Sequence, residues 1–135
     1  MQDEELAEIV DNLRALGSDV SDVEVKRAEG GLPRSARESL VAFSNTHGGT
    51  LILGLDEQTG FAATGLSDPT KMSSDLAAMC TTDIEPPLRP HLGIHEFEGV
   101  RILVAEIQEL PSNRKPCFSR GGGHEPGQFR PSRRR

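Results

Sequence analysis

Apolar side chains recur with the period of an amphipathic helix in three segments of the chain. The first, residues 3–16, has acidic residues in its opening turn and ends at Gly17. The second, residues 33–45, has a proline in its first turn. The third starts at Pro69 and ends before the E-P-P-L-R-P run at 85–90. The predicted buried positions are Leu6, Ile9, Val10, Leu13 and Leu16 in the first helix, Ala36, Leu40 and Phe43 in the second, and Met72, Leu76, Met79 and Cys80 in the third.

Other patterns predict β-strands. Val23 and Val25 alternate with charged residues, which is the period of a half-buried strand. The run from Thr50 to Leu55 is almost uninterrupted apolar sequence, which is typical of a strand covered on both faces. The dipeptide Glu98-Gly99 separates two further apolar segments, as in a two-residue hairpin. The predicted strands are 22–27, 50–55, 61–66, 91–97 and 100–107.

The resulting order of elements is α-β-α-β-β-α-β-β. Because strands that follow one another directly form hairpins, this order predicts an α+β fold with a mixed, largely antiparallel sheet covered by helices. A chain of 135 residues can bury a core as one domain without disulfides or a metal. We assign residues 1–119 to this domain, with the N-terminal helix in residues 1–17. Residues 120–135 form a Gly- and Arg-rich tail that we expect to be disordered.

Charge is distributed unevenly between these two parts. The chain has 15 Lys and Arg, 21 Asp and Glu, and a net charge of −6. Five of the basic residues and one acidic residue lie in 120–135, so residues 1–119 carry ten basic against 20 acidic residues, a net of −10. Non-specific affinity for nucleic acids comes from neutralising phosphates. A domain this acidic is therefore a poor general binder of DNA or RNA, and any such site has to be a local basic patch.

The sequence also bears on the compartment. No apolar run approaches the ~20 residues of a membrane-spanning helix, and the acidic start M-Q-D-E-E-L lacks the pattern of a signal peptide. Cys80 and Cys117 have no metal-ligand spacing, which indicates a reducing environment. We therefore expect a cytoplasmic protein without membrane association.

The stretch 42–56, A-F-S-N-T-H-G-G-T-L-I-L-G-L-D, combines features of a binding site. Gly48 and Gly49 leave the backbone bare where a ligand could approach closely. Asn45 places an amide group beside that backbone, and His47 lies in the same turn. The structural alternative is a helix that ends at glycine and leads into a core strand.

A second candidate site is acidic. On the 22–27 strand, Asp22, Glu24 and Lys26 share one face, and Asp19 lies at the turn just before them. Carboxylates in such a cluster could hold a divalent cation, with Lys26 near a phosphate. The alternative is a solvated sheet face with an ordinary ion pair, and the spacing by itself favours that alternative.

Three segments, S-D-V-E-V-K at 21–26, the stretch 42–56 and K-P-C-F at 115–118, resemble the Schlafen AlbA-type domain. The resemblance covers about residues 18–119. Similar domains usually begin bacterial transcriptional regulators described as DNA- or ATP-binding. In Schlafen proteins, two such lobes form an endoribonuclease that cleaves tRNA and rRNA with three acidic residues. Carried over by position, the resemblance implies catalytic or metal-binding roles for Asp19, Glu24 and either Asp56 or Glu57, with Mg²⁺ or Mn²⁺ as the ion.

The chain departs from the family pattern at several points. Val25 stands where the family has Phe, and Asp19 stands where Glu is usual. A single lobe supplies half of the ribonuclease groove, so a complete groove would need a homodimer. The family continues after the C-F segment into a strand like R-G-M-x-x-G-S-Y-x-R-x-G-D. One shifted reading frame of His124 to Arg135 can encode M-S-Q-G-S-F-V-R-L-G-D, so we expect a frameshifted or truncated end.

These observations favour a nucleic-acid-binding module of a transcriptional regulator, and they favour binding over catalysis. One alternative is a metal-dependent endoribonuclease lobe acting on structured RNA such as tRNA. Another is a nucleotide- or partner-binding domain without catalysis. The expected nucleic-acid contacts are Lys26, Arg27, Arg34, Arg37, Asn45, His47, Gly48, Gly49 and Lys115.

Overall fold

A computed structural model describes residues 1–18, 20 and 22–120. Asp19 and residues 121–135 lie outside the described residues. The tail for which we expect disorder is therefore outside them as well. In chain order the elements are α1 (Asp3–Leu16), β1 (Val23–Lys26), α2 (Ser35–Asn45), β2 (Gly49–Leu53), β3 (Leu55–Asp56), the 3-10 helix η1 (Glu57–Thr59), β4 (Ala62–Ala63), α3 (Pro69–Thr82), β5 (Ile84–Glu85), β6 (His91–Phe97), β7 (Val100–Ile107), the 3-10 helix η2 (Ser112–Arg114) and β8 (Phe118–Ser119).

The main sheet has four strands in the order β1-β2-β7-β6. β1 runs parallel to β2, whereas the β2–β7 and β6–β7 pairs are antiparallel. β2 and β7 are the inner strands, as their nearly continuous apolar sequences predict. Two further pairs of short strands, β3–β4 and β5–β8, lie outside this sheet. The α+β class and the mixed, mostly antiparallel pairing are therefore confirmed.

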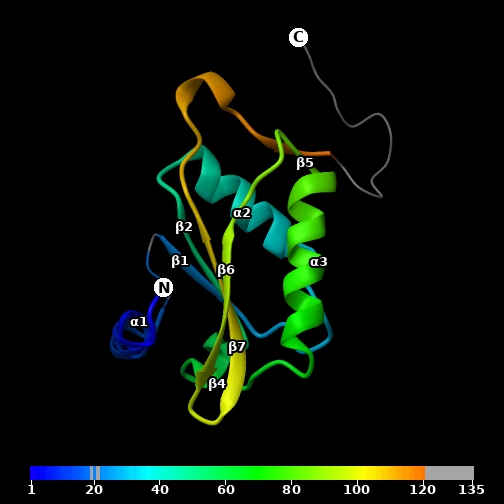
Figure 1. The fold of residues 1–135 in the computed structure, drawn as a ribbon. Coiled ribbons are helices and arrows are strands. Elements are labelled where there is room, and N and C mark those ends of the chain that lie inside the picture. The colour runs from blue at the N-terminus through cyan, green and yellow to red at the C-terminus, as the bar shows by residue number, and fades with distance from the viewer. Residues whose placement is uncertain (19, 21, 121–135) are drawn as a thin grey trace.

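Helices cover both faces of the sheet (Figure 1). α1 packs on one face through Leu6, Val10 and Leu13, which are buried against side chains of β1, β2 and β7. Leu16 is 64% exposed, so its predicted burial is wrong. At about 100° of rotation per residue, Leu16 lies about 80° away from Leu6 around the helix, at the margin of the apolar stripe. None of the three described α-helices combines the length and apolar character that crossing a membrane requires.

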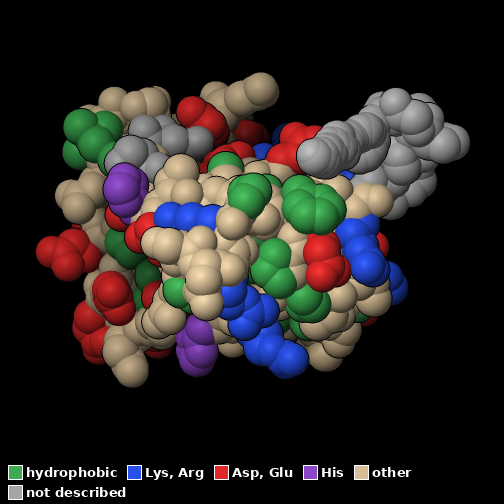
Figure 2. Space-filling model, turned by 90° about the horizontal axis from the view of Figure 1, so that it is seen from above, with side chains coloured by type: hydrophobic (Ala, Val, Ile, Leu, Met, Phe, Trp, Pro, Cys, Tyr) green, Lys and Arg blue, Asp and Glu red, His purple; other side chains and the backbone are tan. Residues whose placement is uncertain are grey.

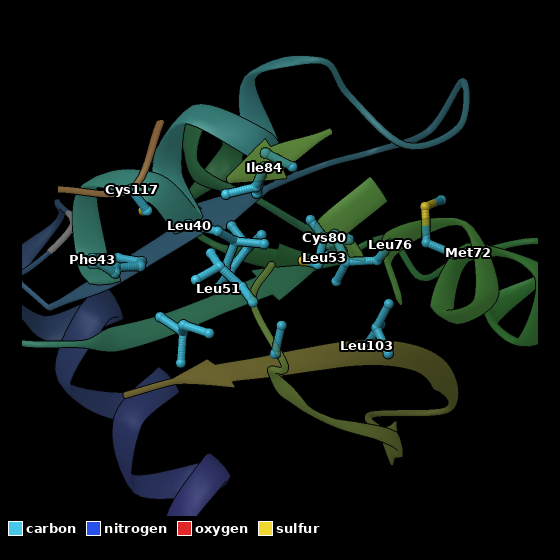
Figure 3. Close-up of a cluster of buried hydrophobic side chains, with 14 residues drawn as sticks. Leu40, Phe43, Leu51, Leu53, Met72, Leu76, Cys80, Ile84, Leu103 and Cys117 are labelled. Carbon is cyan, nitrogen blue, oxygen red and sulfur yellow. The ribbon is translucent and has the colours of Figure 1, made fainter. Parts of the chain in front are cut away.

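α2 and α3 cover the opposite face and enclose the larger core (Figure 3). Leu51 and Leu53 of β2 and Leu103 of β7 meet Leu40 of α2 and Leu76 of α3, and all five are fully buried. Each such side chain contributes about 1.5–3 kcal/mol when removed from water. Burial raises the pKa of the Cys80 thiol in this core to about 11, so the thiol packs as an apolar group.

The central apolar run is divided at Gly54, which has a φ of 115°. Its amide donates to Lys26 O, and its carbonyl accepts from the amides of Thr64 and Gly65. The chain then leaves the main sheet, so residues 55–56 form β3 and pair with Ala62–Ala63. The strand predicted for 61–66 is therefore reduced to two residues.

Gly48 and Gly49 are enclosed by the chain itself. Gly48 has a φ of 79°, and a Cβ there would lie 2.7 Å from the carbonyl oxygen of Ile107. A Cβ on Gly49 would lie 2.4 Å from the ring of Phe43. The bare backbone that the sequence singles out thus lets the turn after α2 pack against β7 and the end of its own helix.

We therefore expect Gly49→Ala to lower the free energy of unfolding by about 1–3 kcal/mol, because the added methyl group overpacks a filled site. Urea denaturation measures the change. Gly30→Ala is the matched control, since a Cβ at Gly30 meets no atom within 4 Å. Equal stability of the two variants would contradict the close packing.

Candidate functional site

Most of the cations predicted to contact nucleic acid are engaged by carboxylates. Each such pair lies on the domain surface or at its margin, where a phosphate would have to displace the carboxylate. Lys115 also lowers the pKa of Glu109 by donating a hydrogen bond to it, which favours the ionised form of that carboxylate. The ion pairs are Lys26–Glu24 at 2.8 Å, Arg27–Glu29 at 2.8 Å, Arg27–Asp56 at 3.6 Å, Arg37–Asp83 at 3.6 Å and Lys115–Glu109.

Arg34 and Arg37 differ in their environments although they are neighbours on α2. The side chain of Arg37 is only 14% exposed because it lies against the end of α3, where Asp83 is its partner. Arg34 is exposed and has no ion pair among the residues that the structure describes. A hollow of about 290 Å³ lies between them and Met79. Of the two predicted contacts on α2, Arg34 is therefore exposed whereas Arg37 is held against Asp83.

Asn45 clamps the 110–118 segment to the end of α2. Its side-chain nitrogen donates to Cys117 O at 3.0 Å, and its side-chain oxygen accepts from the Cys117 amide at 2.8 Å. The neighbouring Ser44 carbonyl accepts from the Leu110 amide at 2.8 Å. The side-chain amide of Asn45 is therefore occupied by hydrogen bonds within the fold. The His47 side chain is exposed at the surface of the turn.

Of the predicted acidic residues, the structure describes Glu24, Asp56 and Glu57. β1 and β2 are neighbours, as a shared site requires, and Glu24 pairs with Leu51 and projects from the face opposite Val23 and Val25. The carboxylate of Asp56 is 11% exposed and accepts from the Gln58 amide, so it caps η1.

The chain leaves the main sheet at Gly54, so Asp56 lies in β3 and Glu57 begins η1, and β3 contacts β1. No group of three or more His, Cys, Asp or Glu residues suited to a metal occurs within 1–18, 20 and 22–120. Asp19, the third predicted ligand of Mg²⁺ or Mn²⁺, lies outside the described residues, so the metal site stays a prediction.

Unpaired cations gather elsewhere. Of the 11 Lys and Arg side chains in the described ranges, seven form ion pairs. The four with neither an ion pair nor a side-chain hydrogen bond are Arg34, Arg89, Arg101 and Arg114. Arg89 and Arg114 line the same groove, so half of the free arginines meet at one place.

This groove has a volume of about 820 Å³ and is bounded by the 87–91 link, the start of β2 and the 106–111 end of β7. His91 adds a third nitrogen-bearing side chain to its lining. Two carboxylates are also present, but the N-terminal amine pairs with Glu106 at 3.0 Å, and Lys115 pairs with Glu109. Seen from above, this end of the molecule shows cationic, histidine and hydrophobic side chains, with acidic side chains along the left and upper edges and also beside cationic side chains on the right (Figure 2).

The sequence pattern does not single out Arg89, His91 or Arg114, which line this groove. It indicates a strand at His91 and a loop at Arg114. The available signal was weak: an arginine between prolines in E-P-P-L-R-P, and a second arginine in the loop after β7. Whether an arginine has a carboxylate partner is decided by residues distant in sequence, so this property could not be read from the local pattern.

The fold and groove define a small α+β domain in which one mixed sheet lies between α1 on one face and α2 and α3 on the other. The family model "Schlafen, AlbA_2" matches residues 19–124. The chain belongs to the Schlafen AlbA_2 family, as the resemblance predicts.

Solved structures agree with this assignment. The solution structure of the N-terminal domain of an ATP-dependent DNA helicase RecG-related protein from Nitrosomonas europaea is 31% identical, with a TM-score of 0.70, and the match covers 93% of this chain and 86% of that one. The DIP2311 protein from Corynebacterium diphtheriae is 20% identical with a TM-score of 0.53, over 87% of this chain and 24% of that one, and shows the fold alone. No curated protein matches the chain.

We predict that Asn45→Ala destabilises the domain, because it removes two hydrogen bonds to Cys117 and leaves buried backbone groups unpaired. A loss of about 1–3 kcal/mol is expected, together with faster amide exchange at residues 115–118. Asn113→Ala, in the exposed η2 turn, is the control and should leave both quantities unchanged. A variant that kept its stability and lost only ligand binding would show that Asn45 contacts a ligand.

Proposed function

We propose that this chain is a nucleic-acid-binding module whose phosphate contacts lie in the groove between the 87–91 link and the end of β7. The observation that carries the proposal is that Arg89 and Arg114, which have no carboxylate partners among the described residues, line one groove of about 820 Å³. Membership of the AlbA_2 family supports it, as does the likeness to a domain of a protein named for DNA helicase RecG.

The number of free cations sets the strength of binding. Two arginines, with His91 when it is protonated, can neutralise two or three phosphates. For single strands, each contact contributes about −0.7 to the slope of log affinity against log salt. Raising salt from about 50 to 200 mM should then weaken binding roughly 10-fold. The acidic surround opposes longer-range attraction, so affinity is modest and contacts are local.

A role in transcriptional regulation fits such a module if it delivers a longer protein to nucleic acid. The residues predicted from sequence, including Lys26, Arg27 and Lys115, could add contacts only by exchanging a carboxylate for a phosphate. A homodimer would double the number of groove arginines and raise affinity. The endoribonuclease alternative requires Asp19 to complete a site with Glu24 and Asp56, and the hollow beside Arg34 is the place that a nucleotide-binding alternative would use.

We predict that Arg89→Glu combined with Arg114→Glu abolishes binding to short oligonucleotides, because both free cations of the groove are reversed. Fluorescence anisotropy at low salt measures the affinity. The matched control is Arg34→Glu with Arg101→Glu, which changes the net charge equally through the two other free arginines. Arg101 lies at the start of β7, at the opposite end of that strand from the groove.

The control variant should lose affinity only modestly, through the general change in charge. Loss of binding in the control with retention in the groove variant would move the interface to α2 and contradict the proposal. Loss in both variants to the same extent would show that net charge, and not the groove, determines binding.

A further inference from the structure

Phe118 is an aromatic side chain left in solvent. The chain has five Phe and neither Trp nor Tyr. Phe43 and Phe61 are buried, and Phe97 is partly buried, whereas Phe118 is 54% exposed. Burying an aromatic ring is one of the largest single gains available to a small domain, so its exposure here has no stabilising value for the described fold.

The backbone that presents Phe118 is held by hydrogen bonds to neighbouring segments. Cys117, directly before it, is held on both sides by Asn45. Phe118 pairs with Glu85 across the β5–β8 ladder. The chain from Glu85 leads at once into Pro87, which lines the groove, and reaches Arg89 four residues on. Four residues reach at most about 14 Å, so Arg89 lies within that distance of Glu85, the strand partner of Phe118.

We propose that the groove binds single-stranded nucleic acid, with one base stacked on Phe118 and the neighbouring phosphates at Arg89 and Arg114. This inference rests on the function proposed above and adds its substrate class. Sites for single strands join a cationic groove to an aromatic surface on which unpaired bases stack, without a requirement for sequence. A base within a duplex has both faces covered by its neighbours and cannot use the ring.

The balance of charges also favours a single strand. A duplex presents one negative charge per roughly 1.7 Å of its axis, and it would face a body of net charge −10 with two free arginines in the groove. Glu106 and Glu109 line the same groove, Glu85 lies four residues before Arg89 in the chain, and each of the three is paired with one cation. Base stacking involves no charge. It therefore adds affinity where only a few phosphate contacts are available.

The test uses the full chain and fluorescein-labelled 10-nucleotide strands of mixed sequence, as single-stranded DNA, single-stranded RNA and duplex DNA. Anisotropy should give at least about 10-fold tighter binding of a single strand than of the duplex. Phe118→Ala should weaken single-strand binding roughly 5- to 150-fold, the range typical of one lost stacking contact. Phe118→Tyr, which keeps an aromatic face, should stay within about twofold of the unaltered chain.

Leu16→Ala is the matched control. Leu16 is also exposed and apolar, but it lies at the end of α1 on the opposite face of the sheet, so its loss should leave binding unchanged. A 2-aminopurine base within the single strand gives a second readout. Its fluorescence should be quenched on binding to the unaltered chain and to Phe118→Tyr, and this readout stands even if Phe118→Ala fails to fold.

Three outcomes would overturn the inference in distinguishable ways. If Phe118→Ala binds normally while the Arg89 and Arg114 double variant does not, stacking is wrong and the proposed function stands. If the duplex binds as tightly as the single strand, the substrate class is wrong. If none of the three probes binds to the unaltered chain, the proposed function fails together with the inference. A difference between the DNA and RNA arms would assign the sugar.

Discussion

The close docking of the turn after α2 onto β7 is the contact on which the rest of this domain depends. Gly48 approaches the Ile107 carbonyl, and Gly49 lies against the Phe43 ring, with no room for a side chain at either place. This contact starts β2 at the register Gly49↔Ile107, so the inner pair of strands is aligned from there. Both layers of helices then pack on a sheet whose centre is fixed by backbone contact.

The same end of the domain also positions the candidate interface. Ser44 and Asn45, the last residues of α2, hold Leu110 and Cys117 through hydrogen bonds. The loop between those two points carries Arg114, and the residue after them is Phe118. The turn after α2, whose sequence is typical of a ligand-binding loop, therefore has a structural role. It holds in place the segment that carries Arg114 and Phe118.

Electrostatics decides which cations remain available. In an acidic body most Lys and Arg residues find a carboxylate, and an exposed pair of this kind contributes little to stability yet occupies the charge that a phosphate would need. Arg89 lies in a proline-rich link, and Arg114 lies in a short 3-10 turn. No described carboxylate forms an ion pair with either arginine, since Glu106 and Glu109 are paired with other cations. Few of the described cations on this domain lack a carboxylate partner, so the two that line the groove distinguish it from the rest of the described surface. The charge of the groove itself is small.

The sequence by itself determined the three helices, the four strands of the main sheet, the α+β class and the family, because local apolar periods and turn residues set helices, strands and the Glu98-Gly99 hairpin. It did not indicate the short strands β5 and β8, which form only by pairing with each other. It misplaced Leu16, which falls at the margin of its stripe, and it extended two strands through Gly54 and toward Leu66, where long-range hydrogen bonds end them. Only the tertiary structure decided the site. Three features depend on residues far apart in the chain: the ion pairs, the hydrogen bonds of Asn45 to Cys117, and the groove that Arg89 and Arg114 both line. No local sequence pattern shows which of these residues come together.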